Sequence, residues 1–373
     1  MKLDSLRGWQ VANRISSDVR ASLIIGQYKL DGGVIQTGEG GEVFGLLLPL
    51  YPPPLDLAST PVNTYELQQL SSQAGELAVT TEQVLQVATR TMRLSDLNLA
   101  ITTLDLPAIH DKLKKFEGLE PIQEELKKIS TWRERVERAN LRVTIADLLN
   151  LDEQAMIEDR YSLLEQARRI LAKINERAKP LLLKAQTIKS GMQMQEYFLL
   201  TGLALSCCTA ELGRLEIAHR ETKQIATIWQ EQSRRIANDL LLGEHPERFL
   251  FSDLVSEVPT ATLVEWLDFA RGKKKGYLWL DDLRKQSRPW YPKGKIPLAP
   301  LKAQKNELKR DQTLIIPTMQ KLVATNNVIN GYVAQYAFLK EKKVKPSKLK
   351  REINSLAEKA AVDGYVILAP TTS

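Results

Sequence analysis

One seam of apolar side chains runs through residues 164–192, LEQARRILAKINERAKPLLLKAQTIKSGM. Its members follow one another at steps of three and four residues: Leu164, Ala167, Leu171, Ile174, Ala178, Leu181, Ala185, Ile188 and Met192. Such steps keep one apolar stripe on one face of a helix, while charged residues occupy the other faces. The pattern predicts a coiled-coil-like helix that packs against a partner helix. A kink or a junction of two helices is expected at Pro180, because proline lacks the amide hydrogen that a helix interior uses.

The same spacing recurs on both sides of this seam. It extends over residues 64–88 and 122–139, and a run after the seam repeats every seven residues at Leu215, Thr222, Trp229 and Ile236. Long amphipathic helices of this kind gain most of their stability by packing on one another. We therefore predict a mainly α protein, an elongated bundle of long amphipathic, coiled-coil-like helices in which more than about half of the residues are helical.

The N-terminal region breaks the helical pattern. Residues 2–24 can form a first helix, but seven glycines follow between residues 26 and 45. Within that segment, the apolar pairs at 34–35 and 43–44 are typical of short strands. We predict a small glycine-rich segment here, either a β-hairpin or a flap, and a further edge strand at residues 364–368.

Composition divides the chain into three predicted regions. They are an N-terminal helix with the glycine-rich segment at residues 1–58, a helical bundle at 59–243, and a basic helical region with tryptophan and proline at 244–373. Residues 272–373 hold 21 Lys and Arg against 8 Asp and Glu, a net charge of +13, while the rest of the chain holds 31 against 37, a net charge of −6. This asymmetry indicates an anionic partner for the last region, or charge matching within the molecule or an oligomer.

The basic segment at residues 272–310 also carries aromatic residues. It has twelve Lys or Arg against three acids, and four prolines prevent a continuous helix. Lysines neutralise phosphates without reading sequence, and tryptophan or tyrosine rings can stack on bases, so we predict a nucleic-acid contact. Anionic lipid is a second ligand class, and core anchoring of the aromatic rings is the structural alternative. The predicted binding residues, three of them in a second basic cluster at 340–351, are Lys273, Lys274, Lys275, Tyr277, Trp279, Arg284, Lys285, Arg288, Trp290, Lys342, Lys343 and Lys345.

An apolar block, YFLLTGLALSCCTA, occupies residues 197–210 between two amphipathic runs. Its fourteen residues are too few for a permanent transmembrane helix. One interpretation is a helix buried on all sides where several helices meet. The other is a concealed membrane-insertion element, as in helical pore-forming toxins, formed by Tyr197, Phe198, Leu199, Leu200, Leu203 and Leu205. Cys207 and Cys208 lie inside the block and are typical of a buried, reduced pair.

No constellation of catalytic residues is visible in the sequence. The three histidines are far apart and lack metal-ligand spacing, and neither a nucleophile elbow nor a dinucleotide fingerprint is present. Asp281 and Asp282, preceded by Asp268, could hold a divalent cation, but adjacent acids in a basic loop more often form local ion pairs. We therefore predict a non-enzymatic protein without a cofactor or a metal, and an enzyme whose active site assembles from distant residues is the last of the alternatives.

The leading hypothesis is a helical assembly protein. It self-associates or binds a helical protein partner through its seams, and it presents the basic, aromatic region to an anionic partner, with nucleic acid favoured. The alternative is a soluble helical toxin subunit that inserts residues 197–210 into a membrane. The N-terminus, MKLD, shows no basic stretch followed by an apolar core, so we expect no secretory signal and a cytoplasmic location, while export without a cleaved signal stays open.

Overall fold

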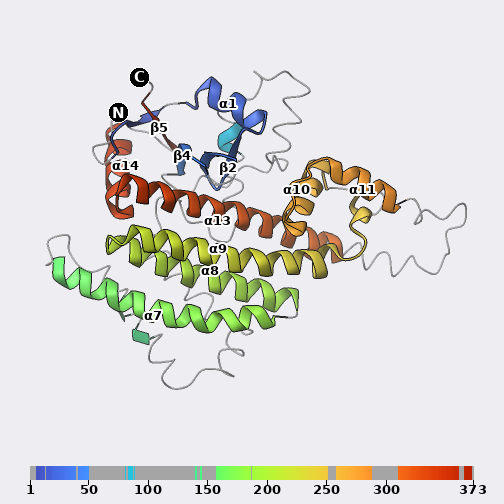
Figure 1. Cartoon of the computed structure of the whole chain (residues 1–373), viewed down its shortest axis with the longest axis horizontal. Coiled ribbons are helices and arrows are strands. Elements are labelled where there is room, and N and C mark those ends of the chain that lie inside the picture. The colour runs from blue at the N-terminus through green and yellow to red at the C-terminus, as the bar shows by residue number, and fades with distance from the viewer. Residues whose placement is uncertain are drawn as a thin grey trace, which may run out of the picture.

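The computed structural model shows a helical bundle with a small antiparallel sheet on one side (Figure 1). It describes residues 6–12, 14–38, 41–49, 80, 83–86, 88, 139–140, 143–144, 157–185, 187–250, 258–287, 310–360 and 365–371. Most of these residues are helical, which confirms the predicted mainly α class. Most of the predicted helices at 64–88 and 122–139 lie outside the described residues.

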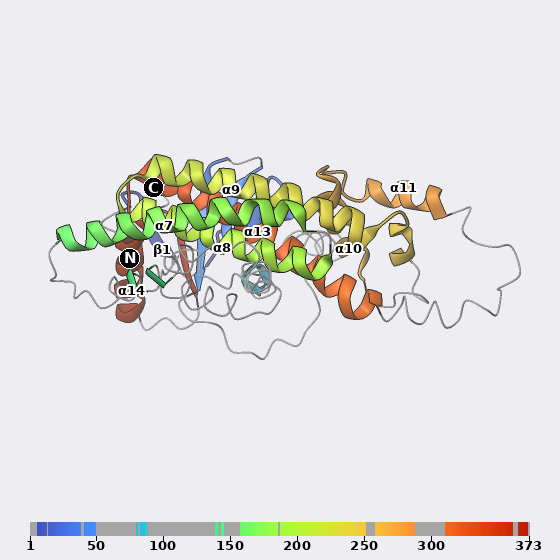
Figure 2. The ribbon, with the colours of Figure 1, turned by 90° about the horizontal axis from the view of Figure 1, so that it is seen from below.

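Four long helices form the described bundle: α7 (Ile157–Lys184), α8 (Ile188–Glu211), α9 (Leu215–Arg235) and α13 (Ile316–Lys342). α8 packs against both α7 and α9, and α9 packs against α13 (Figures 1 and 2). The seam residues of α7 are buried in these contacts, among them Leu164, Ala167 and Leu171. The three- and four-residue steps thus mark the face that packs on another helix, while coiled-coil geometry stays a prediction.

The predicted junction within the seam lies after Pro180 rather than at it. α7 continues through Pro180 to Lys184, and α8 begins at Ile188. Thr187 caps α8, because its side-chain oxygen accepts the backbone N–H of Ser190 at 3.2 Å. A hydroxyl that pairs with an amide of the first turn stabilises a helix start. The seam is therefore shared between two helices.

α8 lies at the centre of the bundle. All of its residues from 197 to 210 are buried, including the six of the predicted insertion element. Gly202 lets α9 approach closely, because a Cβ at this position would lie 2.7 Å from the side chain of Ile225. The Asn175 side chain on α7 donates to the Phe198 carbonyl oxygen at 2.7 Å and to Thr201 Oγ1 at 2.9 Å. In this structure the block is a core helix, as the first of the two interpretations expects.

The end of the bundle near the C-terminus of α9 is held together by Arg248. α9 continues into the π-helical η1 (Ile236–Leu242), the 3-10 helix η2 (Pro246–Leu250) follows, and the π-helical η3 (Asp311–Ile315) leads into α13. The Arg248 guanidinium donates to the carbonyl oxygens of Leu241 and Leu242 and pairs with Asp311 at 3.2 Å. Carbonyls at a helix end need such donors. Two shorter helices, α10 (Thr260–Arg271) and α11 (Leu278–Ser287), pack on this end of the bundle.

The sheet joins the two ends of the described chain. Its five strands have the order β1-β5-β4-β3-β2, and every neighbouring pair is antiparallel. The strands are β1 (Trp9–Ala12), β2 (Tyr28–Asp31), β3 (Val34–Thr37), β4 (Val43–Pro49) and β5 (Tyr365–Pro370). The strands predicted at 34–35 and 43–44 are confirmed, and β2 and β3 form a hairpin within the glycine-rich segment.

Two predictions for the sheet region are wrong. Residues 2–24 do not form one helix, since β1 comes first and α1 (Ser17–Ile24) begins only after Ser16, whose hydroxyl accepts the Val19 N–H at 3.3 Å. The strand predicted at 364–368 is not at an edge, because β5 lies between β1 and β4. The three predicted regions themselves stay a prediction, although β5 from the third completes the sheet of the first.

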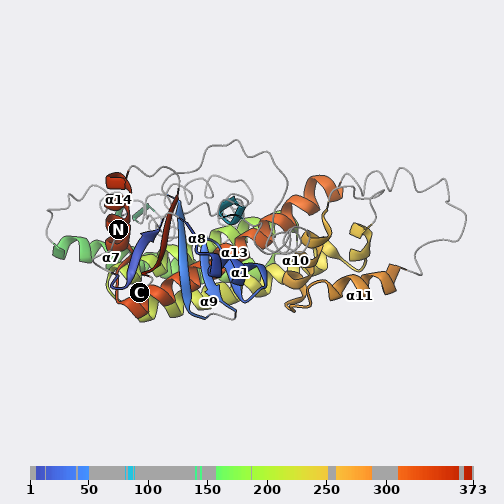
Figure 3. The same ribbon diagram turned by 90° about the horizontal axis from the view of Figure 1, so that it is seen from above.

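The sheet packs on α13 (Figure 3). The tightest approach is at Gly331 of α13, where a Cβ would lie 2.6 Å from the carbonyl oxygen of Asp31. On the sheet side, a Cβ at Gly32 would lie 2.7 Å from the Val328 Cα. Gly32 also has a φ of 52°, which suits the turn between β2 and β3. Two glycines therefore let the hairpin turn lie directly on the helix backbone.

Candidate anion-binding pocket

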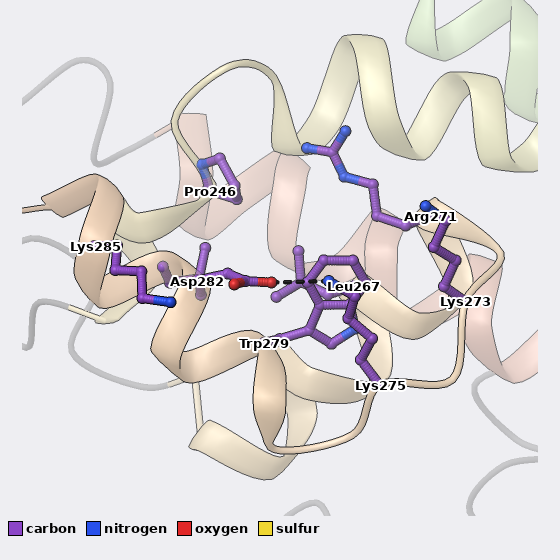
Figure 4. A pocket seen from close by; sticks show the side chains of 9 residues that line it. Pro246, Leu267, Arg271, Lys273, Lys275, Trp279, Asp282 and Lys285 are labelled. Atoms are coloured by element: carbon purple, nitrogen blue, oxygen red, sulfur yellow. Dashed lines mark hydrogen bonds and ion pairs between the residues drawn. The ribbon is translucent and has the colours of Figure 1, made fainter.

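A hollow of about 510 Å³ lies between α10, α11 and the start of η2 (Figure 4). Four of the predicted binding residues line it, namely Lys273, Lys275, Trp279 and Lys285. The other lining residues are Pro246, Leu267, Arg271, Asp282 and Leu283. The lining of the pocket thus combines apolar side chains with four cations and one carboxylate. We call it the α10–α11 pocket.

The loop between the two helices begins with a left-handed helix cap. α10 ends at Gly272, which has a φ of 61°, and the N–H of Lys273 donates to the Asp268 carbonyl oxygen at 3.2 Å. Glycine takes this conformation without the strain that a Cβ would cause. The cap turns the chain back toward α11, which places Lys273 and Lys275 at the pocket.

Asp268 holds the rest of the loop. Its Oδ1 accepts the backbone N–H of Lys275 at 2.8 Å, the backbone N–H of Gly276 at 3.2 Å and the indole Nε1–H of Trp279 at 2.7 Å. Hydrogen bonds to an ionised acceptor are stronger than neutral ones. One carboxylate therefore fixes both the loop and the orientation of the Trp279 ring.

Trp279 forms a wall of the pocket rather than a free platform. The ring is half-buried and packs against the core. Lys275 Nζ lies 4.5 Å from the ring centroid, a cation–π contact that covers one face. A base could stack on that face only if Lys275 moved.

The pocket has an excess of positive charge. Lys275 Nζ pairs with Asp282 Oδ2 at 2.9 Å, and this contact holds the pKa of Asp282 below its ordinary value. Arg271, Lys273 and Lys285 form no ion pair within the described part of the chain. Three cations that form no ion pair surround one hollow and favour an anionic ligand, although Lys285 lies near enough to Asp282 to help lower the pKa of that carboxyl.

The other predicted binding residues of the basic segment either lie in this region without lining the pocket or fall outside the described residues. Lys274 and Tyr277 belong to the loop but do not line the hollow, and Arg284 pairs with Asp281 at 3.6 Å. Arg288 and Trp290 lie outside the described residues. Asp281 and Asp282 thus both form local ion pairs with basic neighbours.

The second basic cluster lies at the other end of α13. The 27 residues of α13 separate it from the α10–α11 pocket, which corresponds to about 40 Å of helix (Figure 1). Lys342 pairs with Glu341 at 2.7 Å and lies 5.8 Å from the Phe338 ring centroid. Lys343 is the left-handed cap of α13, with a φ of 55°, and Lys345 is exposed near Gly213. The structure therefore does not bring the two clusters together.

Several residues around this second basic cluster connect the helices that meet there. The Glu211 carboxylate at the end of α8 accepts the backbone N–H of Ser347 at 2.7 Å and its hydroxyl at 2.6 Å. Ser347 lies in the first turn of α14 (Pro346–Ala360), where a carboxylate complements the unpaired amides. Lys340 pairs with Glu216 at 3.6 Å. These contacts join α8, α9, α13 and α14.

Sequence reasoning missed the pocket residue Arg271, and it considered Asp268 only as part of a possible cation site, not as the residue that holds the loop. Arg271 stands alone at the end of an apolar helix, and only the helix cap places it beside Lys273. Asp268 is eleven residues from Trp279, and no local pattern marks the bond between them. The one signal in the sequence that could have revealed the role of Asp268 is its position as a carboxylate just before the glycine and lysines of the loop.

Two absences within the described ranges concern the sequence hypotheses. No helix in the described ranges carries an apolar run long enough to cross a membrane. Within the same ranges, no group of three or more His, Cys, Asp or Glu residues is arranged to hold a metal ion. Comparison of the chain with models of known protein families, with curated proteins and with solved structures gave no match.

Proposed function

We propose that this chain is a non-enzymatic helical protein that binds a phosphate-bearing polymer, with nucleic acid favoured, at the α10–α11 pocket. The observation that carries the proposal is the set of Arg271, Lys273 and Lys285, which surround one hollow and form no ion pair in the described chain. Arginine and lysine neutralise phosphates regardless of base sequence. Binding should therefore depend weakly on sequence and strongly on salt.

The second part of the proposal concerns assembly. We propose that amphipathic helices of this chain serve self-association or a helical protein partner through coiled-coil-like packing. Tyr161 and Leu183 on α7 support this part, because both are exposed large apolar side chains on the outermost long helix of the described bundle. Sedimentation at several protein concentrations would test it, and a monomer at every concentration would count against self-association.

Anisotropy of a labelled oligonucleotide tests the binding proposal. We would titrate single- and double-stranded oligonucleotides of about 20 nucleotides while varying the salt concentration. The variant Arg271→Ala/Lys273→Ala/Lys285→Ala should lower the salt slope by up to about three units, since each phosphate contact contributes about 0.7 to 0.9. Its matched control, Lys342→Ala/Lys343→Ala/Lys345→Ala, removes the same charge at the far end of α13.

The control should leave the slope nearly unchanged if the pocket is the site. Equal loss in both triple variants would show that net charge, rather than the pocket, drives binding. Absence of binding by the wild-type chain even at low salt would reject nucleic acid as the partner. Vesicles that contain anionic lipid then test the second ligand class.

A further inference from the structure

Asp282 carries the only carboxylate among the described residues that line the α10–α11 pocket, and it already forms an ion pair with one of the pocket's cations. Asp282 Oδ2 lies 2.9 Å from Lys275 Nζ. We infer that Asp282 is a built-in competitor for the ligand: it pairs with Lys275 until a phosphate binds and takes its place. This inference rests on the proposed function and adds a specificity-determining residue to it.

The exposure of the ion pair makes such an exchange feasible. The side chains of Lys275 and Asp282 are 41% and 40% exposed, so a ligand can reach the contact from solvent. Exposed ion pairs contribute little to folding, and breaking one therefore costs the fold little. Lysine has three donors on a flexible stem and can turn from one anion to another without moving the backbone.

A second cation can receive the displaced carboxylate. Figure 4 shows Asp282 directed toward Lys275, with the Lys285 amine on its other side. Lys285 also contributes to the electrostatic stabilisation of the Asp282 carboxylate. The exchange therefore leaves Asp282 beside a positive charge.

The competition would select for ligands of high charge. A ligand with a single weak negative charge gains little by replacing a carboxylate that is already in place. A run of phosphates engages Arg271 and Lys273 first and then adds Lys275 as a further contact. Specificity arises here because a ligand must break the ion pair between Asp282 and Lys275, and a weakly charged anion gains too little to do so.

The adjacent Asp281 provides a matched control. It carries the same charge one position earlier on α11, but it pairs with Arg284, is 65% exposed and does not line the pocket. Asp281→Asn and Asp282→Asn thus change the net charge equally. Only Asp282→Asn releases Lys275 into the pocket.

The test is binding of the labelled single strand of about 20 thymidines across a salt series. Asp282→Asn should bind about three- to tenfold more tightly than the wild-type chain, because its Lys275 loses no carboxylate partner on binding. The salt slopes of the two chains should be similar, because Lys275 meets a phosphate in both complexes. Asp281→Asn should change affinity by less than about twofold and leave the slope unchanged, because its exposed carboxylate pairs with Arg284 and does not line the pocket.

The possible outcomes separate the inference from the proposed function. The competition would be overturned if the wild-type chain bound the oligonucleotide and both variants gained affinity equally, or if Asp282→Asn lost affinity. The proposed function would stand in either case. No binding by any of the three chains at low salt would overturn the proposed function and the inference with it. Binding by Asp282→Asn alone would support the competition and contradict the proposed function of the native chain.

Discussion

The indole N–H of Trp279 donates to Asp268 Oδ1 at 2.7 Å, and the same oxygen accepts the backbone N–H groups of Lys275 and Gly276. One atom of α10 thus positions both the wall of the α10–α11 pocket and the loop that carries its lysines. The shape of the pocket depends on this side chain, although Asp268 itself does not line the hollow.

Replacing Asp268 should therefore weaken both the fold and the binding. Asp268→Ala removes a charged acceptor of three hydrogen bonds, and we expect the free energy of unfolding to fall by about 2–3 kcal/mol. Trp279→Phe keeps an aromatic ring in the wall but removes the N–H and the second ring of the indole, so its loss should be about 1–2 kcal/mol. Urea unfolding measures both.

Asp281→Ala is the control for this pair of variants. Its side chain is exposed and its ion pair with Arg284 is local, so stability should change by less than about 0.5 kcal/mol. Asp268→Ala could prove as stable as Asp281→Ala and bind oligonucleotide as tightly as the wild-type chain. That result would contradict the claim that Asp268 positions the loop and the Trp279 ring.

The sequence predicted those features that depend on local spacing. Three- and four-residue steps identified the buried face of α7, because a helix of 3.6 residues per turn repeats that face over short distances. β5 was misplaced because its partners β1 and β4 are more than 300 residues away in the chain, and strand order is a property of the folded sheet. The sequence pointed to four residues that line the pocket, because consecutive lysines and a nearby tryptophan are visible in the chain, but it did not predict the pocket, which Arg271 joins only through the turn at Gly272.

A second prediction concerns the contact between the sheet and α13. Alanine is a better helix former than glycine by about 1 kcal/mol, so Gly331→Ala would stabilise a free helix. Here the new Cβ would lie 2.6 Å from the Asp31 carbonyl oxygen, a backbone atom that cannot turn aside. We expect a net loss of about 1–2 kcal/mol in thermal or urea unfolding.

Gly191→Ala tests whether this loss is specific. The Cβ at Gly191 of α8 would meet mainly the tip of the Ile236 side chain, at 2.7 Å, and such a tip can change rotamer. Its stability should therefore stay within about 1 kcal/mol of the wild-type chain, since helix propensity offsets the contact. A Gly331→Ala variant more stable than Gly191→Ala would contradict the close docking of the hairpin.

A third prediction uses the two cysteines of α8 as reporters. Both side chains are buried, and burial raises the pKa of the Cys208 thiol to about 12. Only the thiolate reacts quickly with alkylating reagents, so at about pH 8 the folded chain should resist iodoacetamide. In urea both thiols should react, which gives the control. Rapid labelling of the native chain would show that α8 opens far more readily than its packing implies.

The last prediction separates the core role of α8 from membrane insertion. Leu203 is fully buried, so Leu203→Ala should cost about 2–5 kcal/mol, and Leu203→Asp should prevent stable folding by placing an unpaired charge in the core. Leu183→Ala on α7 is the matched control: Leu183 is 43% exposed, and its loss should change stability by less than about 0.5 kcal/mol.

Leakage of a dye from liposomes completes this test. If α8 is a permanent core helix, the wild-type chain should cause no leakage, and its thiols should stay protected from iodoacetamide when liposomes are added. Insertion would require α8 to leave its contacts with α7 and α9, which exposes the buried apolar residues from 197 to 210. Leakage by the wild-type chain, its loss in a Leu203→Asp variant that remains folded, and labelling of Cys208 in the presence of liposomes would together favour the toxin hypothesis over the assembly protein.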